Sequence, residues 1–216
     1  MRPEPLAAKI CGLSTPDAVR AALEGGAAYV GFVFFPASPR NVRPELAARL
    51  AEPARNKAGV VAVTVDADDQ ALDVIMAVLK PDLIQLHGRE TPSRAAQVAA
   101  RTGAGVIKVL PVGESSDLEA AAAFDGAAEH LMFDAKPPKD AARPGGHGTA
   151  FDWSILAGRR FSRPWLLAGG LDPWNAGEAA RLSGAPLLDV SSGVERGPGV
   201  KDPALISAFL EAVRRA

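Results

Sequence analysis

Short apolar runs recur along the chain at a nearly regular spacing, and this spacing limits the possible folds more than any single motif does. The runs begin near Leu6, Tyr29, Gly59, Leu83, Gly105, His130, Pro164 and Leu187. The intervals between these starts are 23, 30, 24, 22, 25, 34 and 23 residues, and each accommodates one strand, one helix and two short connections. Runs such as 60–65 are apolar almost throughout, which is typical of parallel strands buried on both faces.

Eight alternating strand and helix units form either a closed barrel or an open, doubly wound sheet. The 216 residues divided by 8 units leave 27 per unit, near the lower end of the range for (β/α)8 barrels. An open sheet that binds nucleotides usually has a glycine-rich first turn, and residues 12–15 contain neither that motif nor a phosphate-loop lysine. We therefore predict an α/β fold, a single-domain (β/α)8 TIM barrel of near-minimal size spanning residues 1–216.

Composition excludes several classes of protein. Lys and Arg number 24 against 25 Asp and Glu, and neither sign forms a block, so nucleic acid and membrane surfaces are not expected partners. No stretch reaches the roughly 18 apolar residues of a membrane helix, and the first eight residues lack an apolar signal core. The one cysteine, Cys11, excludes disulfides and cysteine-rich zinc sites. We expect a soluble, cytoplasmic protein without a metal site.

Polar residues that directly follow the apolar runs are the candidates for chemistry, because the strand carboxyl ends of such a barrel form the catalytic face. These residues are Cys11, Arg40, Asp66, His87, Lys108, Asp134, Gly169-Gly170 and Asp189-Val190-Ser191-Ser192-Gly193. The two longest intervals follow the second and sixth apolar runs, and their extra residues form loops at 36–44 and 135–148. We expect these two loops to cover a ligand.

Two small-residue turns predict a phosphate site. Gly169 and Gly170 end the seventh run, and Ser192 and Gly193 end the eighth. Glycine lets backbone N–H groups approach an anion closely, and the loops after strands seven and eight are the usual phosphate site of these barrels. A glycine pair alone would equally fit an ordinary tight turn, but both turns fall where the barrel requires them.

Cys11 and Asp134 each allow two interpretations from the residues alone. A single cysteine is often an inert core residue rather than a catalyst. Asp134 follows three apolar residues, so its carboxyl needs a partner, and an ion pair with Lys9 or Lys136 is as reasonable as a catalytic role. An apolar barrel rim favours a protonated carboxyl, and a lysine and backbone amides near the thiol favour a partial thiolate.

Arg40 and His87 are weaker candidates. The guanidinium of Arg40, on the first long loop, suits a bidentate contact with a substrate carboxylate, although surface arginines are common. His87 suits either a base or a hydrogen-bond partner, and we place it with the substrate-binding residues.

The remaining histidines and the tryptophans carry less functional information. His147 lies in a glycine-rich stretch that suits a flexible lid, and His130 begins a strand and is expected to be structural. Trp153, Trp165 and Trp174 follow turns late in the chain, where we expect them to pack in the core.

Seven of these stretches, in order, resemble the phosphoribosylanthranilate isomerase family of tryptophan biosynthesis. They are Lys9-Ile10-Cys11-Gly12, Ser38-Pro39-Arg40, Gln85-Leu86-His87-Gly88, Phe133-Asp134, Gly145-Gly146-His147-Gly148 with Phe151-Asp152-Trp153, Ala168-Gly169-Gly170-Leu171, and Asp189-Val190-Ser191-Ser192-Gly193-Val194-Glu195. The first and last are the most specific. The third strand departs from the family by lacking the usual glycine and phenylalanine before Asp66.

The resemblance implies an Amadori rearrangement of N-(5-phosphoribosyl)anthranilate to 1-(2-carboxyphenylamino)-1-deoxyribulose 5-phosphate. Asp134 corresponds to the family's general acid, which protonates the ribose ring oxygen, and Cys11 corresponds to the general base, which removes the C2 proton. The implied binding residues are Arg40 for the anthranilate carboxylate, Gly169, Gly170, Ser192 and Gly193 for the phosphate, and Asp189 for the ribose. No metal or organic cofactor is implied, and the chain is expected to act as a monomer or homodimer.

Two other functions remain open. Another phosphate-binding barrel enzyme is one, but an indoleglycerol-phosphate synthase needs a catalytic lysine and several glutamates, and a ribulose-phosphate epimerase needs metal-binding histidines. The other is a non-catalytic binder of phosphorylated metabolites, which would have no need of both Cys11 and Asp134.

Overall fold

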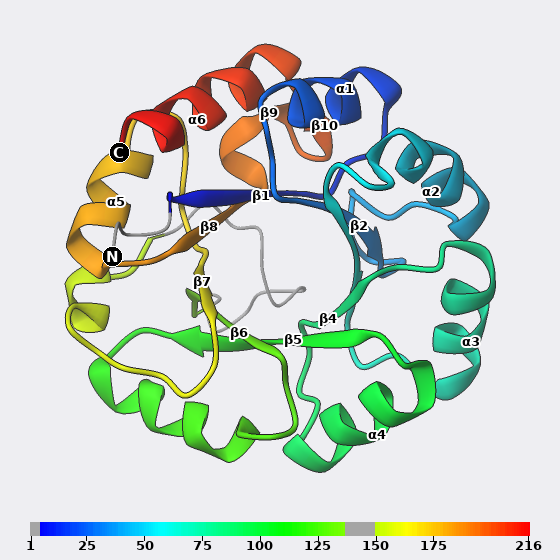
Figure 1. The fold of residues 1–216 in the computed structure, drawn as a ribbon, viewed down its shortest axis with the longest axis horizontal. Helices are drawn as coiled ribbons and strands as arrows, with labels where there is room; N and C mark the ends of the chain where they lie inside the picture. The colour runs from blue at the N-terminus through cyan, green and yellow to red at the C-terminus, as the bar shows by residue number, and fades with distance from the viewer. Residues whose placement is uncertain (1–4, 137–149) are drawn as a thin grey trace.

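The structure is a computed structural model, and it describes residues 5–136 and 150–216. Eight parallel strands close into one barrel in chain order (Figure 1), which confirms the predicted fold class. The strands are β1 (Ala7–Cys11), β2 (Tyr29–Phe34), β3 (Gly59–Thr64), β4 (Leu83–Leu86), β5 (Gly105–Val112), β6 (His130–Ala135), β7 (Trp165–Leu167) and β8 (Leu187–Val190). Six begin at the predicted residue, and β1 and β7 begin one residue later.

Helices surround the barrel (Figure 1). They are α1 (Pro16–Glu24), α2 (Pro44–Ala51), α3 (Asp69–Val78), α4 (Pro92–Thr102), α5 (Ala176–Ser183) and α6 (Pro203–Arg215), with a short 3-10 turn η1 (Glu52–Ala54) after α2. The side chains of Thr15, Asp68 and Thr91 cap the first turns of α1, α3 and α4. Such caps end each βα loop at a defined residue.

In two connections the described residues form 3-10 helix and no α-helix. Between β5 and β6 lies η2 (Ser115–Phe124), whose buried residues Leu118, Ala121 and Phe124 recur every three residues. That spacing matches three residues per turn. Between β6 and β7, the described residues form only the turn η3 (Trp153–Leu156), where we had expected a longer helix.

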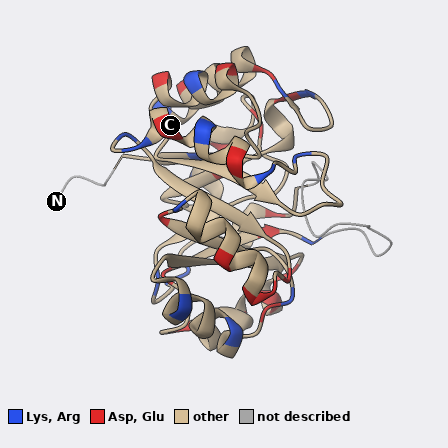
Figure 2. Ribbon diagram, turned by 90° about the vertical axis from the view of Figure 1, so that its right-hand side faces the viewer, with Lys and Arg blue, Asp and Glu red and all other residues tan. Residues whose placement is uncertain are grey.

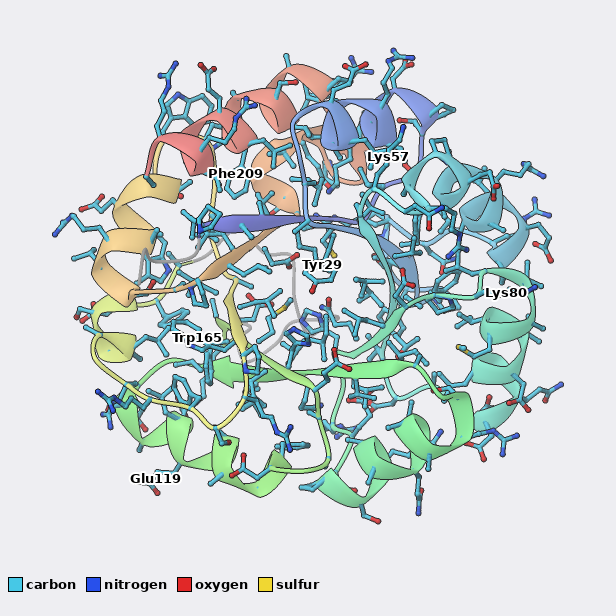
Figure 3. All side chains as sticks on the ribbon, in the orientation of Figure 1. Tyr29, Lys57, Lys80, Glu119, Trp165 and Phe209 are labelled. Atoms are coloured by element: carbon cyan, nitrogen blue, oxygen red, sulfur yellow. The ribbon has the colours of Figure 1, made fainter. Side chains whose placement is uncertain are left out.

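The core has two parts because successive side chains of a strand point to opposite faces. Inside the barrel lie residues such as Cys11, Val63 and Met132, and Figure 3 shows Tyr29 pointing into this interior. Outside, the alternate residues pack against the helices, with Phe209 of α6 facing the barrel wall in the same view. This alternation places Lys9 on the interior face with Cys11.

The expectation for the tryptophans holds only in part. Trp153 is buried, and Trp165 packs against Phe133 with ring centroids 5.5 Å apart. Trp174 is 80% exposed, so core packing was wrong for this residue. Asp172 accepts the backbone N–H groups of Trp174 and Asn175 in a tight turn, and the indole lies on the outside of that turn.

Acidic and basic residues alternate over the outer helices (Figure 2). Among the described helices, none is both long and apolar enough to cross a membrane. After β8 the chain forms a 3-10 turn, η4 (Ser192–Val194), and a small hairpin of β9 (Glu195–Gly197) and β10 (Val200–Lys201). This hairpin packs against the loop after β2, since a Cβ at Gly199 would lie 2.5 Å from the Pro39 carbonyl oxygen.

Candidate active site

The interior of the barrel contains a buried ion pair directly below the candidate base. Lys9 Nζ lies 2.8 Å from Asp189 Oδ1, and both side chains are buried. Gly31 leaves room for the lysine, because a Cβ there would lie 3.2 Å from Nζ. Burial alone favours the neutral amine, but the charges of Asp189 and Cys11 outweigh it and raise the pKa of Lys9. Lys9 therefore carries a full positive charge under the thiol.

Cys11 ends β1 and is 6% exposed. Burial raises the pKa of the thiol above its ordinary 9.0, although Lys9 and Lys201 act in the opposite direction. The sequence led us to expect a partial thiolate near a lysine. The lysine is present, but desolvation by the surrounding apolar residues is the larger effect, so the substrate-free thiol is protonated at neutral pH.

Asp134 is the next-to-last residue of β6 and faces His87, with His87 Nε2 3.2 Å from Asp134 Oδ2. Neither ion pair suggested for Asp134 forms, because Lys9 pairs with Asp189 and Lys136 pairs with Asp117 at 2.6 Å. Gly169 packs tightly beside the carboxyl, since a Cβ there would lie 3.2 Å from Asp134 Oδ1. The candidate acid thus touches the turn predicted to hold phosphate.

Gln85, which the sequence did not single out, orients the histidine. Its Nε2 lies 3.0 Å from His87 Nδ1, and Gln85 is completely buried. When this amide donates to Nδ1, the imidazole proton lies on Nε2, toward Asp134. Nε2 is buried and makes no well-aligned hydrogen bond with a described residue.

Arg40 is buried rather than on the surface, at 5% exposure. Its Nε lies 2.7 Å from Glu195 Oε1 and its Nη2 lies 2.9 Å from Glu195 Oε2. The side chain packs on Gly12, where the backbone has φ +77° and a Cβ would lie 2.7 Å from Arg40 Cδ. Arg40 is therefore held against the residue that follows Cys11.

Lys201 is a further buried cation that the sequence analysis missed. Its Nζ lies 2.5 Å from Glu195 Oε1 and donates to the Ser191 carbonyl oxygen at 2.9 Å. Ser191 in turn donates its hydroxyl to the Cys11 carbonyl oxygen at 3.2 Å. No sequence pattern marks Lys201, because its significance comes from its position beside Glu195 and Ser191.

The two turns predicted to bind phosphate lie next to each other. Gly169 and Gly170 have φ of +91° and +68°, which favours glycine. Gly193 approaches the other loop so closely that a Cβ there would lie 1.9 Å from the Leu171 carbonyl oxygen. The backbones after β7 and β8 are thus in direct contact, and small residues are needed where they meet.

Several other candidates lie elsewhere. Lys108 lies on the outer side of the barrel wall, where its Nζ pairs with Glu90 at 2.7 Å and lies 5.9 Å from the centre of the Phe124 ring. Asp66 accepts the Arg89 backbone N–H at the end of β3. His130 begins β6 and packs edge-on against Tyr29, at the end of the barrel opposite Cys11.

His147 and most of the loop at 135–148 lie outside the described residues. Within residues 5–136 and 150–216, no group of three His, Cys, Asp or Glu side chains is arranged to hold a metal ion.

Comparison with known proteins identifies the family. The model of the N-(5'-phosphoribosyl)anthranilate isomerase family matches residues 8–212. A protein of that name from Caulobacter vibrioides is 67% identical over 211 residues, covering 97% of this chain and 96% of the relative.

Two solved structures agree over nearly the full length. One is a phosphoribosylanthranilate isomerase in complex with reduced 1-(o-carboxyphenylamino)-1-deoxyribulose 5-phosphate, with 30% identity, a TM-score of 0.83 and coverage of 98% of this chain and 100% of that chain. The other is a monomeric form of the dimeric enzyme from Thermotoga maritima, with 30% identity, a TM-score of 0.82 and the same coverage. The chain belongs to the N-(5'-phosphoribosyl)anthranilate isomerase family.

Proposed function

We propose that this chain catalyses the Amadori rearrangement of N-(5-phosphoribosyl)anthranilate in tryptophan biosynthesis. The main support is the arrangement at one end of the barrel. Cys11 is the last residue of β1, Asp134 is the next-to-last residue of β6, and the turn at Gly169 contacts Asp134. A thiol, a carboxyl and an anion-binding turn in one barrel mouth are the groups that this reaction requires, and the family membership supplies the substrate.

In the first step Asp134 acts as general acid. Its carboxyl proton passes to the ribose ring oxygen, the bond from C1 to that oxygen breaks, and an open-chain Schiff base forms. His87 Nε2 lies 3.2 Å from Asp134 Oδ2. No described lysine or arginine forms an ion pair with Asp134.

In the second step Cys11 acts as general base. The thiol first loses its proton to solvent, and the thiolate then takes the C2 proton of the Schiff base. The electron pair of the C2–H bond forms the C1–C2 double bond while the π pair of the C1=N bond moves onto the nitrogen. The resulting enolamine tautomerises to the aminoketose. Lys9 and Lys201 both favour the thiolate. The protein only donates and accepts protons in these steps, and the bond changes occur within the substrate, so the proposed route uses neither a metal nor an organic cofactor.

The substrate's two anionic ends have separate binding groups in this proposal. The phosphate binds to backbone N–H groups at Gly169, Gly170, Ser192 and Gly193, where the two loops meet. The anthranilate carboxylate binds to the guanidinium N–H groups of Arg40 that Glu195 does not occupy. Asp189 Oδ1 already pairs with Lys9 Nζ at 2.8 Å. A contact from Asp189 to the ribose therefore requires that the carboxylate bind Lys9 and the sugar at the same time.

We further propose that residues 1–216 form one domain and act as a monomer or homodimer. A cytoplasmic location suits the mechanism, because the base is a thiol that must stay reduced.

The test is a fluorescence assay of the loss of phosphoribosylanthranilate with wild type, Cys11→Ser and Asp134→Asn. Each substitution is expected to lower kcat at least about a thousandfold, since each removes a required proton-transfer group. An inactive wild type that still binds the product analogue would instead favour a non-catalytic binder. Near-normal turnover by both variants would overturn the assigned roles.

A further inference from the structure

A buried cluster of three charged side chains adjoins the candidate base without taking part in the proposed proton transfers. We call Arg40, Glu195 and Lys201 the charged triad. It joins the loop after β2 to the hairpin after β8, and the three side chains are at most 6% exposed. Glu195 Oε1 accepts hydrogen bonds from Arg40 Nε at 2.7 Å and from Lys201 Nζ at 2.5 Å. Its other oxygen, Oε2, accepts one from Arg40 Nη2 at 2.9 Å.

Counting the charges shows what Lys201 adds. Arg40 and Glu195 alone would form a neutral pair, with the glutamate repelling any second carboxylate brought to the same guanidinium. Burial lowers the pKa of Lys201, while Glu195 acts in the opposite direction. In its ammonium form Lys201 contributes a second cation, and the triad then carries a net charge of +1. A buried site with an uncompensated positive charge is unfavourable unless an anion joins it.

The donor count points to the same conclusion. A guanidinium has five N–H groups in a fixed plane, and Glu195 occupies Nε and one N–H of Nη2. The end formed by Nη1 and the second N–H of Nη2 presents two parallel donors, which match a carboxylate. Glu195 thus orients Arg40 from one side and leaves the geometry for a second carboxylate intact.

The lysine is itself fixed by acceptors. Besides Glu195, Nζ lies 2.9 Å from the Ser191 carbonyl oxygen and 3.3 Å from the Ser191 hydroxyl. Ser191 is also bonded to the Cys11 carbonyl oxygen. The triad is therefore tied to the strand end that carries the thiol.

We propose that Lys201 is a positioning residue that makes the Arg40 site selective for a substrate carboxylate, by neutralising Glu195. This inference rests on the proposed function, since it assumes that the substrate's aromatic carboxylate binds to Arg40. Lys201 does not touch the substrate in this proposal; it acts through Glu195.

The chain offers a matched control in Lys108. Its Nζ also meets one glutamate, Glu90 at 2.7 Å, and two backbone oxygens, those of Leu86 and Gly88. Glu90 is not shared with an arginine; its oxygens accept the backbone N–H groups of Asp66 and Gly88. Removing Lys108 therefore disturbs a buried ion pair of similar construction outside the barrel mouth.

The experiment measures equilibrium binding by calorimetry, with no need for turnover. Two probes are used: reduced 1-(2-carboxyphenylamino)-1-deoxyribulose 5-phosphate, and the same compound without the carboxyl group. Lys201→Met is expected to weaken binding of the carboxylated probe about ten- to hundredfold, as for loss of a charged partner, and to leave the other probe nearly unchanged. Lys108→Met is expected to leave the affinity ratio of the two probes at its wild-type value.

Two further variants keep the test valid if Lys201→Met folds poorly. Lys201→Gln retains donors but not the charge and is expected to lose the same selectivity, whereas Lys201→Arg is expected to restore most of it. An affinity ratio that stays at the wild-type value in Lys201→Gln would overturn the proposal. Failure of wild type to bind either probe would instead count against the proposed function.

Discussion

The two sides of the barrel mouth are built from different kinds of side chain. The base side, around Cys11, contains the buried charges of Lys9, Asp189 and the charged triad. The acid side, around Asp134, contains an amide and an imidazole, from Gln85 and His87. Three cations and two carboxylates surround the thiol, whereas no described lysine or arginine pairs with the Asp134 carboxyl.

This difference matches the roles that we propose for the two groups. A base is useful as an anion, and the surplus of positive charge on the base side favours the thiolate against the cost of burial. The Asp134 carboxyl instead faces the His87 imidazole, and no described lysine or arginine forms an ion pair with it. The two sides therefore differ in the charge that they place beside the proposed proton-transfer group, although burial still raises the pKa of the free Cys11 thiol.

The largest expected effect comes from Lys9, in the middle of the base side. Lys9→Met leaves Asp189 buried without its cation, and we expect the free energy of unfolding to fall by about 3–5 kcal/mol. Urea denaturation provides the measurement. The control is Lys136→Met, which breaks the exposed pair with Asp117 and should cost less than about 1 kcal/mol. If the free energy of unfolding fell equally in both variants, the charges on the base side would not form a buried network.

Gly12 tests how closely the Arg40 side chain is tied to Cys11. Ala at this position must adopt φ +77° and place a Cβ 2.7 Å from Arg40 Cδ. The strain should cost about 1–2 kcal/mol, and displacement of Arg40 should raise KM about tenfold, as for one lost charged hydrogen bond. Gly26→Ala is the matched control, with φ +78° and no atom within 4 Å. A rise in KM of the same size in both variants would contradict the prediction.

Gln85 tests the acid side. Gln85→Leu removes the amide that orients His87, and we expect kcat to fall about tenfold, the value of one hydrogen bond. The unfolding free energy should not fall, because Oε1 of Gln85 is buried without a described partner and leucine removes that oxygen. Steady-state kinetics and urea denaturation give the two values. An unchanged kcat would show that His87 needs no orientation.

The smallest expected effect is a change in how stability depends on pH. Burial alone would raise the pKa of Glu195, but Arg40 and Lys201 outweigh it and lower that pKa below its ordinary 4.5. The stabilisation from this carboxylate is therefore present above about pH 4.5 and is lost as the pH falls toward the lower folded-state value. The gap in unfolding free energy between wild type and Glu195→Gln should shrink on acidification. A gap that is constant with pH would exclude this contribution.

Much of the fold was predictable from local pattern. Six strand starts were placed correctly because a buried parallel strand requires a short apolar run, and the glycine turns after β7 and β8 followed from their positions. Trp174 was misplaced, because an apolar side chain in a turn can lie on either side of it. Lys9 and Lys136 were the ion-pair partners suggested for Asp134, and both were wrong. Nearness in sequence, or a position on a strand of the same barrel, does not decide which side chains meet.

The sequence by itself determined the barrel and which residues stand at its strand ends, since periodicity is a local property of the chain. Only the tertiary structure decided which charges pair. Lys9 meets Asp189 across 180 residues of sequence, and Arg40 meets Glu195 across 155. These contacts exist because closing the barrel places β8 beside β1 and the loop after β8 beside the loop after β2. The surplus of positive charge around Cys11 is therefore a consequence of closure, because distant side chains become neighbours only when the last strand joins the first.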